Sequence, residues 1–291
     1  MSAMSNRDFN VENLPRTRRM QFLDILNTRF RLLVLIGLIT ILSSLPLIAL
    51  IAFRDIAIVN VSNAFLEEKI DSETLVAQTN NLRIIYHLGL FVALPFIALS
   101  LSGNLRVMRQ LIWGEGVFYR EDFKMGLKQN ALCFILCSEI FAIFSFVQYL
   151  IRILIGGYIA PGISYGIELI AIFPLIMTYC YSHTIYTNTF VNSLKNSFIL
   201  TFKNLPEVFL FFILTYGVVF LKYIENSLVK MIILVILLVF YIPLALLASF
   251  LSQMHIYDKD LNIRYHKDLY KRGLYISDKK IDEPTWKGGN Q

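Results

Sequence analysis

Four of the ionisable side chains that lie inside long apolar stretches of the sequence or at their edges are candidates for a functional role. Glu139 lies eight residues inside one such stretch, and His183 lies near the end of the next. Arg152 and Glu168 fall close to the neighbouring ends of the same two stretches. Because a charge at bilayer depth is costly, each of these residues is a candidate functional group.

Several kinds of chemistry are open to these groups. Glu139 suits a proton- or cation-linked site, a hydrogen bond to a polar group on another helix, or a carboxylic acid kept neutral by burial. A salt bridge, or side chains that reach the membrane interface, would account for Arg152 and Glu168. Three tyrosines near His183 favour an interfacial aromatic belt, with a ligand site as the alternative: Tyr179, Tyr181 and Tyr186.

Sequence signatures of enzymes are missing. There is no HExxH, no GxSxG between a strand and a helix, no phosphate loop with its lysine, and no pair of aspartates in an apolar stretch. Cys133, Cys137 and Cys180 all fall inside apolar stretches, which is typical of small packing residues rather than of disulfide or zinc sites. We therefore expect no enzymatic activity, no metal site and no cofactor.

The composition predicts an integral membrane protein. The chain of 291 residues is 56% hydrophobic and 16% charged, whereas soluble domains carry about 25% charged residues. Its apolar runs approach the roughly 20 residues that cross a bilayer. We predict an all-α, polytopic transmembrane bundle of six helices, at 32–53, 84–102, 131–151, 163–186, 208–221 and 231–251. A membrane domain, 32–251, would then lie between an N-terminal segment, 1–31, and a C-terminal tail, 252–291.

Positive charge alternates between the loops that join these predicted spans. Summed over alternate segments, one side of the bundle carries 21 Lys and Arg residues and the other carries 6. Because segments rich in Lys and Arg stay in the cytoplasm, both termini are predicted to be cytoplasmic. The tail has eight cations against six acids. This near balance argues against nucleic-acid binding and favours a segment at the membrane surface that becomes disordered near Gly288.

Cytoplasmic amphipathic helices are predicted before the third and fifth spans, with a weaker copy before the first. The stretch 103–136 is predicted to be such a helix running straight into a span. Residues 119–134 align with 194–209, and Asp122 and Ser197, both favourable cap residues, occupy equivalent positions. Charged residues near these helices would hold them in the headgroup layer or dock a cytoplasmic partner: Arg109, Arg120, Asp122, Lys124, Lys128, Lys195 and Lys203.

The chain resembles the YesL-like family of bacterial integral membrane proteins, a family of unknown function. The resemblance covers most of residues 16–260, and its specific part lies within 102–130: Ser102, Gly103, Val107, Arg109, Glu115, Val117, Phe118, Asp122, Phe123, Leu127, Lys128 and Asn130. Ala98-Leu99 stands where members often have Gly-Pro. The resemblance implies a plasma-membrane protein encoded beside carbohydrate importers and their sensors, and it assigns no catalytic or binding residue.

Two functions are expected on these grounds. The amphipathic helices and the resemblance favour an accessory or scaffold protein that lies in the lipid bilayer and associates with a carbohydrate transporter or sensor. The alternative is a transporter or a permease-like subunit of an ATP-driven importer, because the loop 187–206 has a permease-like layout that ends in Leu205-Pro206. Residues 187–189, however, are Thr-Asn-Thr where the importer loop usually has Glu-Ala-Ala, which weakens a coupling role.

Overall fold

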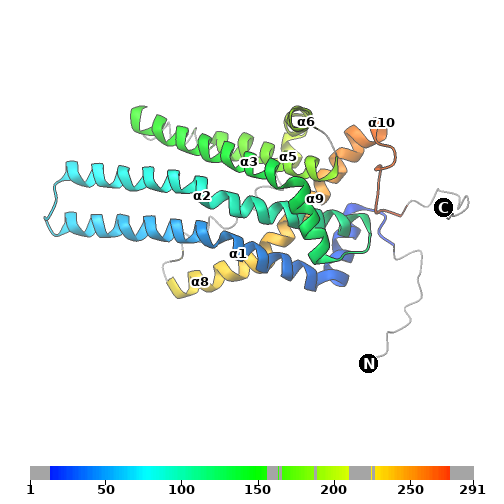
Figure 1. The fold of residues 1–291 in the computed structure, drawn as a ribbon, viewed down its shortest axis with the longest axis horizontal. Coiled ribbons are helices and arrows are strands. Elements are labelled where there is room, and N and C mark those ends of the chain that lie inside the picture. Colours follow the sequence, from blue (N-terminus) through cyan, green and yellow to red (C-terminus); the bar gives the residue numbers. More distant parts are fainter. Residues whose placement is uncertain are drawn as a thin grey trace, which may run out of the picture.

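The computed structural model describes residues 14–155, 163, 166–186, 189–209, 224 and 227–275, and this part of the chain is all-α (Figure 1). Its helices, in which the η segments are π-helical, are α1 (Arg18–Leu66), α2 (Ser72–Trp113), α3 (Tyr119–Ile155), η2 (Glu168–Ile172), α5 (Phe173–Ile185), α6 (Phe190–Lys203), α8 (Ser227–Ile236), η4 (Leu237–Tyr241), α9 (Ile242–Tyr257), η5 (Asp258–Asn262) and α10 (Ile263–Tyr265).

Four of the described helices are long and apolar enough to cross a membrane: Arg18–Leu66, Ser72–Trp113, Tyr119–Leu154 and Val229–Tyr265. A shorter apolar helix, Ile170–Ile185, occupies most of the predicted fourth span. The predicted fifth span lies almost entirely outside the described residues. The prediction of a multi-pass, all-α membrane protein is therefore confirmed for these four helices.

The first helix is much longer than the predicted first span. Thr17 starts α1 by accepting a hydrogen bond from the Met20 N–H at 3.3 Å. At Arg29 the backbone leaves helical geometry (φ −124°, ψ 21°), so a short helical segment precedes the rest of α1. The 49 residues of α1 extend about 74 Å, against a hydrocarbon core of roughly 30 Å. The α1–α2 hairpin therefore projects beyond the other helices at one end of the bundle (Figure 1).

The stretch 103–136 is a helical hairpin, so the prediction of one amphipathic helix there is wrong. α2 continues as far as Trp113, and Gly114 ends it with a left-handed backbone (φ 71°). α3 then begins at Tyr119 and runs without a break into the apolar region. A hairpin forms because the glycine adopts the left-handed conformation at little cost, which reverses the chain at this point.

The expected shared cap is found in only one of the two copies. The Asp122 carboxylate, in the first turn of α3, accepts a hydrogen bond from the Phe118 N–H at 2.9 Å and so caps the start of the helix from within. Ser197 instead lies inside α6, where its hydroxyl donates to the Ser193 carbonyl at 2.7 Å. The alignment therefore places Asp122 correctly, and its prediction for Ser197 is wrong.

Glycines set the closest contacts between helices. A Cβ added at Gly126 of α3 would lie 2.6 Å from the Ser102 carbonyl oxygen of α2. A Cβ added at Gly37 of α1 would lie 2.1 Å from the Val239 carbonyl oxygen of η4. Because only a glycine leaves room for backbones this close, these residues fix where the helices cross, as small residues do in membrane bundles.

A large cluster of buried side chains lies at one end of the bundle, where α2, α5 and α9 meet. Its fully buried side chains include Leu105, Met108, Ile112, Tyr179, Tyr181, Leu247, Phe250 and Tyr257. Elsewhere large apolar side chains are exposed, including Leu42 (64%), Val92 (68%) and Leu132 (72%). Exposed apolar surface of this extent on long helices is expected where the solvent is lipid.

The C-terminal segment 258–275, which we call the cap segment, folds back over this end of the bundle. α9 runs through the predicted boundary between residues 251 and 252 and leads directly into the cap segment. Arg18 pairs with Asp258 at 2.7 Å, and the Tyr275 N–H donates to the Pro15 carbonyl at 2.9 Å. The first and last described residues therefore lie together (Figure 1).

Candidate functional site

Arg152 and Glu168 meet in one polar pocket at the end of the bundle opposite the cap segment. The pocket encloses about 460 Å³ between α1, α2, α3 and η2. We call it the arginine pocket, and it is lined by Arg54, Asp55, Ile58, Arg83, Tyr86, His87, Ser145, Tyr149, Arg152 and Glu168. The two residues for which a salt bridge was predicted thus belong to a larger cluster that contains three arginines and two carboxylates.

Aromatic stacking gives the arginine pocket one ordered wall. The His87 ring stacks on the Tyr149 ring with 4.7 Å between centroids, and its Nδ1 lies 3.3 Å from the Ser145 hydroxyl. The Tyr149 hydroxyl donates to the Asn80 carbonyl at 3.2 Å. These contacts join α2 to α3 and hold the two rings in place.

Sequence reasoning did not identify Arg54 and Arg83 as site residues. Each lies next to the end of a predicted span, 32–53 and 84–102, where an arginine is ordinarily read as an interfacial anchor. The signal that would have found them is the coincidence of charges at the same end of three successive spans. That coincidence predicts a shared site only once the helices are known to pack against one another.

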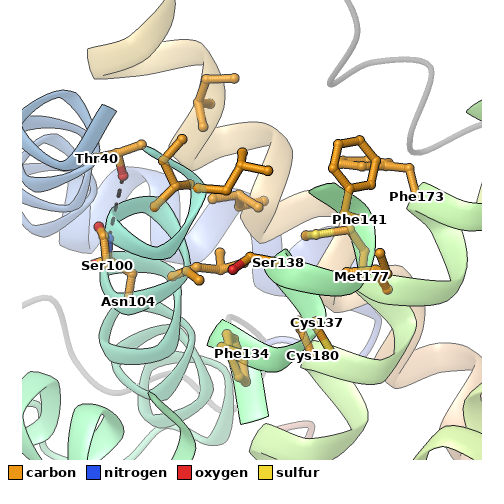
Figure 2. Close-up of a pocket in the computed structure, with 17 residues that line it drawn as sticks. Thr40, Ser100, Asn104, Phe134, Cys137, Ser138, Phe141, Phe173, Met177 and Cys180 are labelled. Atoms are coloured by element: carbon orange, nitrogen blue, oxygen red, sulfur yellow. Dashed lines mark hydrogen bonds between the residues drawn. The ribbon is translucent and has the colours of Figure 1, made fainter. Parts of the chain in front are cut away.

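A second, mainly apolar cavity of about 370 Å³ lies in the middle of the bundle, between α1, α2, α3, α5 and α9 (Figure 2). Phe134, Phe141, Phe173 and Met177 supply much of its wall, and Cys137 and Cys180 face each other there (Figure 2). We call it the central cavity. Ser138 lines it, whereas the neighbouring Glu139 does not.

One edge of the central cavity is polar and joins three helices. The Asn104 amide nitrogen lies 3.2 Å from the Ser100 hydroxyl and 3.4 Å from the Thr40 hydroxyl. The Tyr119 hydroxyl donates to the Asn104 amide oxygen at 3.0 Å. Because Asn104 is almost fully buried, these bonds replace the water that its amide loses on folding.

The other intramembrane candidates are not brought to either cavity. Glu139 is half-buried, and among the described residues no hydrogen bond or ion pair reaches its carboxylate. The His183 ring stacks on the Tyr179 ring with 5.6 Å between centroids. The predicted interfacial belt is wrong, because Tyr179, Tyr181 and Tyr186 are buried core residues. Tyr186, for example, donates to the Asn262 amide oxygen at 2.6 Å.

Three of the seven predicted docking residues make contacts within the protein. The Arg109 guanidinium donates to the Thr184 carbonyl at 2.6 Å and lies 4.5 Å from the centre of the Trp113 ring, so it ties α2 to α5. Asp122 caps α3, and Lys203 forms an ion pair with Asp260. The other four side chains are exposed: Arg120, Lys124, Lys128 and Lys195.

Helix α6 has its apolar side facing outward. Its buried residues are small or polar apart from one leucine: Ser193, Ser197, Leu200 and Thr201. The opposite side exposes Val191 (71%), Phe198 (53%), Ile199 (52%) and Phe202 (44%), which we call the α6 apolar face. A water-facing helix of a soluble domain has the reverse arrangement. The α6 apolar face therefore suits lipid or an apolar partner surface.

Comparison of the chain with protein-family models, curated proteins and solved structures finds no match.

Proposed function

We propose that the chain is an accessory or scaffold protein of the bacterial plasma membrane that associates, through α6, with a carbohydrate transporter or sensor. The observation that carries this proposal is the α6 apolar face. α6 lies beside the cap segment and has an exposed cation, Lys195, next to Phe198 and Phe202. A helix that offers both apolar and basic side chains is suited to the inner membrane interface and to proteins embedded there.

The contacts that attach α6 to the cap segment favour a role in binding a partner protein over a role as a flexible membrane anchor. Lys203 and the Asn204 side chain both bind the Asp260 carboxylate, the latter at 2.9 Å. The Phe198 and Phe202 rings also contact each other, with 4.6 Å between centroids. The α6 apolar face is thus presented on a helix whose position is fixed by the cap segment, which reduces the entropy lost when a partner binds.

Six membrane crossings and cytoplasmic termini form part of the same proposal. Glu168 lies in the arginine pocket, whereas Thr184 contacts Arg109 near the cap segment, so η2 and α5 pass from one end of the bundle to the other. Gly37 of α1 lies beside Val239, which places the start of α8 toward the arginine pocket. The proposal includes the predicted fifth span, 208–221, as the connection between these two ends, and the charge asymmetry favours a cytoplasmic cap segment.

Membership of the YesL-like family is proposed on the motif within residues 102–130. Several residues of this motif make contacts that stabilise the fold. Gly103 lies against the Phe123 ring, Asp122 caps α3, and Arg109 joins α2 to α5. The carbohydrate part of the proposal comes from the family resemblance alone.

Site-specific photocrosslinking in native membranes tests the docking proposal. A photoreactive phenylalanine analogue placed at Phe198 should form an adduct with a carbohydrate-transporter subunit or a sensor kinase, identified by mass spectrometry. The matched control is the same analogue at Leu88, which is 52% exposed on α2 and should give lipid adducts. Lipid adducts alone at Phe198 would contradict the proposal.

The central cavity favours transport as the second candidate function. Because its wall is almost entirely apolar, it suits an apolar or amphiphilic solute better than a sugar, whose hydroxyls would lose hydrogen bonds there. Saturable flux of labelled fatty acid into proteoliposomes should be abolished by Ser138→Phe, which fills the cavity. Glu139→Gln is the matched control and should retain flux. No flux of either fatty acid or oligosaccharide would argue against a transporter.

A further inference from the structure

The arginine pocket concentrates positive charge from three helices that are far apart in sequence. Arg54 comes from α1, Arg83 from α2 and Arg152 from α3. The two carboxylates of the pocket, Asp55 and Glu168, leave one net positive charge. Like charges held in one pocket repel each other, so a bound anion would relieve an unfavourable interaction as well as form new ones.

One guanidinium is held in place before any ligand arrives. The Arg54 Nη2 lies 2.7 Å from the Asp55 carboxylate, and its guanidinium carbon lies 4.4 Å from the centre of the Tyr86 ring. A stacked, ion-paired guanidinium loses little conformational freedom on binding and keeps further N–H groups available to an oxyanion. Arg54 therefore has the arrangement of a preorganised anion ligand.

A second guanidinium has no partner inside the described part of the protein. Arg83 is exposed at the pocket, and no described residue forms a hydrogen bond or an ion pair with it. Its position is one turn from His87, whose ring is fixed against Tyr149 at 4.7 Å. Arg83 can therefore close on a ligand that rests against the ordered aromatic wall.

We propose that the arginine pocket binds an anionic phosphate group, with Arg54 and Arg83 as its principal ligands. Guanidinium and phosphate form short, paired, charge-assisted hydrogen bonds. The pocket volume of about 460 Å³ exceeds that of a single ion and leaves room for the glycerol or sugar moiety that carries the phosphate. The phosphate belongs either to a phospholipid headgroup or to a soluble phosphate ester.

The location of the pocket is compatible with both sources. It lies near the end of α3, beyond which the α1–α2 hairpin projects (Figure 1), and arginines mixed with tyrosines are typical of the headgroup layer. A purely structural cluster of ion pairs is the competing explanation. That explanation leaves the exposed and unpartnered Arg83 without a role.

Binding measurements on the full-length protein in a maltoside detergent test this proposal. The probes are short-chain phosphatidylglycerol and glycerol 3-phosphate, with short-chain phosphatidylcholine as the neutral comparison. For the wild type we expect saturable binding of at least one anionic probe by calorimetry. Its Kd should rise at least tenfold in Arg54→Gln/Arg83→Gln, because two charge-assisted contacts are lost. Arg83→Gln alone keeps the test available if the double variant fails to fold.

The control variant is Arg264→Gln/Lys267→Gln, which removes two exposed positive charges from the opposite end of the bundle and should leave Kd unchanged. If the protein binds phosphatidylglycerol but not glycerol 3-phosphate, the result supports the proposal and identifies a lipid headgroup as the ligand. Binding of both with similar Kd supports it and identifies soluble phosphate esters. The proposal is overturned if neither anionic probe binds. It is also overturned if Arg54→Gln/Arg83→Gln and Arg264→Gln/Lys267→Gln weaken binding equally.

Discussion

The Asp258 carboxylate joins three parts of the chain at the end of the bundle where both described ends lie. One oxygen pairs with Arg18 at 2.7 Å. The other accepts hydrogen bonds from the Asn262 amide at 2.8 Å and from the Lys271 N–H at 3.0 Å. The side chains of Arg18 and Asp258 are each only 9% exposed. A buried charge of this kind is tolerated because a counter-ion and two further donors satisfy both carboxylate oxygens.

We predict that Asp258→Ala is strongly destabilising. The change leaves Arg18 buried without its counter-ion, a situation that costs about 3–5 kcal/mol in other proteins. The midpoint of thermal unfolding in detergent should therefore fall by many degrees. Glu67→Ala is the matched control, since it breaks the exposed pair with Lys69 and should cost at most about 1 kcal/mol. Equal shifts for the two variants would refute the role assigned to Asp258.

Helix α6 packs against α5 and is also joined to the cap segment by a polar contact at Asp260. Burial by itself would raise the pKa of Asp260, but hydrogen bonds from Lys203 and Asn204 outweigh it and hold this pKa below its ordinary value of 3.8. Asp260 belongs to the cap segment, beyond the last predicted span. Because its pKa is lower in the folded protein, the contact stabilises the docked α6 at every pH above 3.8 and is lost only as pH falls further.

We predict that Asp260→Ala loosens α6 without unfolding the bundle. Loss of about 1 kcal/mol of attachment should speed amide hydrogen exchange within Phe190–Lys203 by roughly fivefold at neutral pH. The exchange of α2 and α9 should be unaffected. Asp268→Ala, which removes an exposed carboxylate from the same segment, is the control and should change nothing in α6. In the wild type the same loosening should appear only below pH 3.8.

The helices also show where sequence reasoning succeeds and where it stops. Apolar runs predicted α2 and α3 as crossing helices, because hydropathy reports the part of a helix that lies in hydrocarbon. Hydropathy does not report where a helix ends, so the extension of α1 to Leu66 and of α2 to Trp113 was not predicted. The near balance of charge predicted a tail at the membrane surface. It did not predict that the cap segment packs against the bundle, where Asp258 and Asn262 find partners far away in the sequence.

At the scale of the whole molecule, the arginine pocket marks the limit of prediction most clearly. Arg152 and Glu168 were predicted to be adjacent because their spans are consecutive. Arg54 and Arg83 join them only because α1 and α2 pack beside α3, and a single sequence carries no direct record of that packing. The same packing brings the two described ends of the chain together. If both ends lie on one side of the membrane, the chain between them crosses it an even number of times.

Chemical labelling of single cysteines in intact cells tests this topology. In a variant without native cysteines, a membrane-impermeant maleimide should label Lys69→Cys in the α1–α2 turn from outside the cell. Glu121→Cys and Asp268→Cys should react only after permeabilisation, because the segments that carry them lie at the end of the bundle with the larger positive charge. Labelling of these two positions from opposite sides would contradict an even number of crossings between them.

Two further positions distinguish six crossings from four. Lys195 lies on α6 and Lys230 on α8, with the predicted fifth span between them. Six crossings predict that Lys195→Cys is protected in intact cells and that Lys230→Cys is labelled, because the chain changes sides between α6 and α8. If both positions share one side, the fifth crossing does not exist. A complete reversal of all labelling would preserve the six-span bundle and place the cap segment outside the cell.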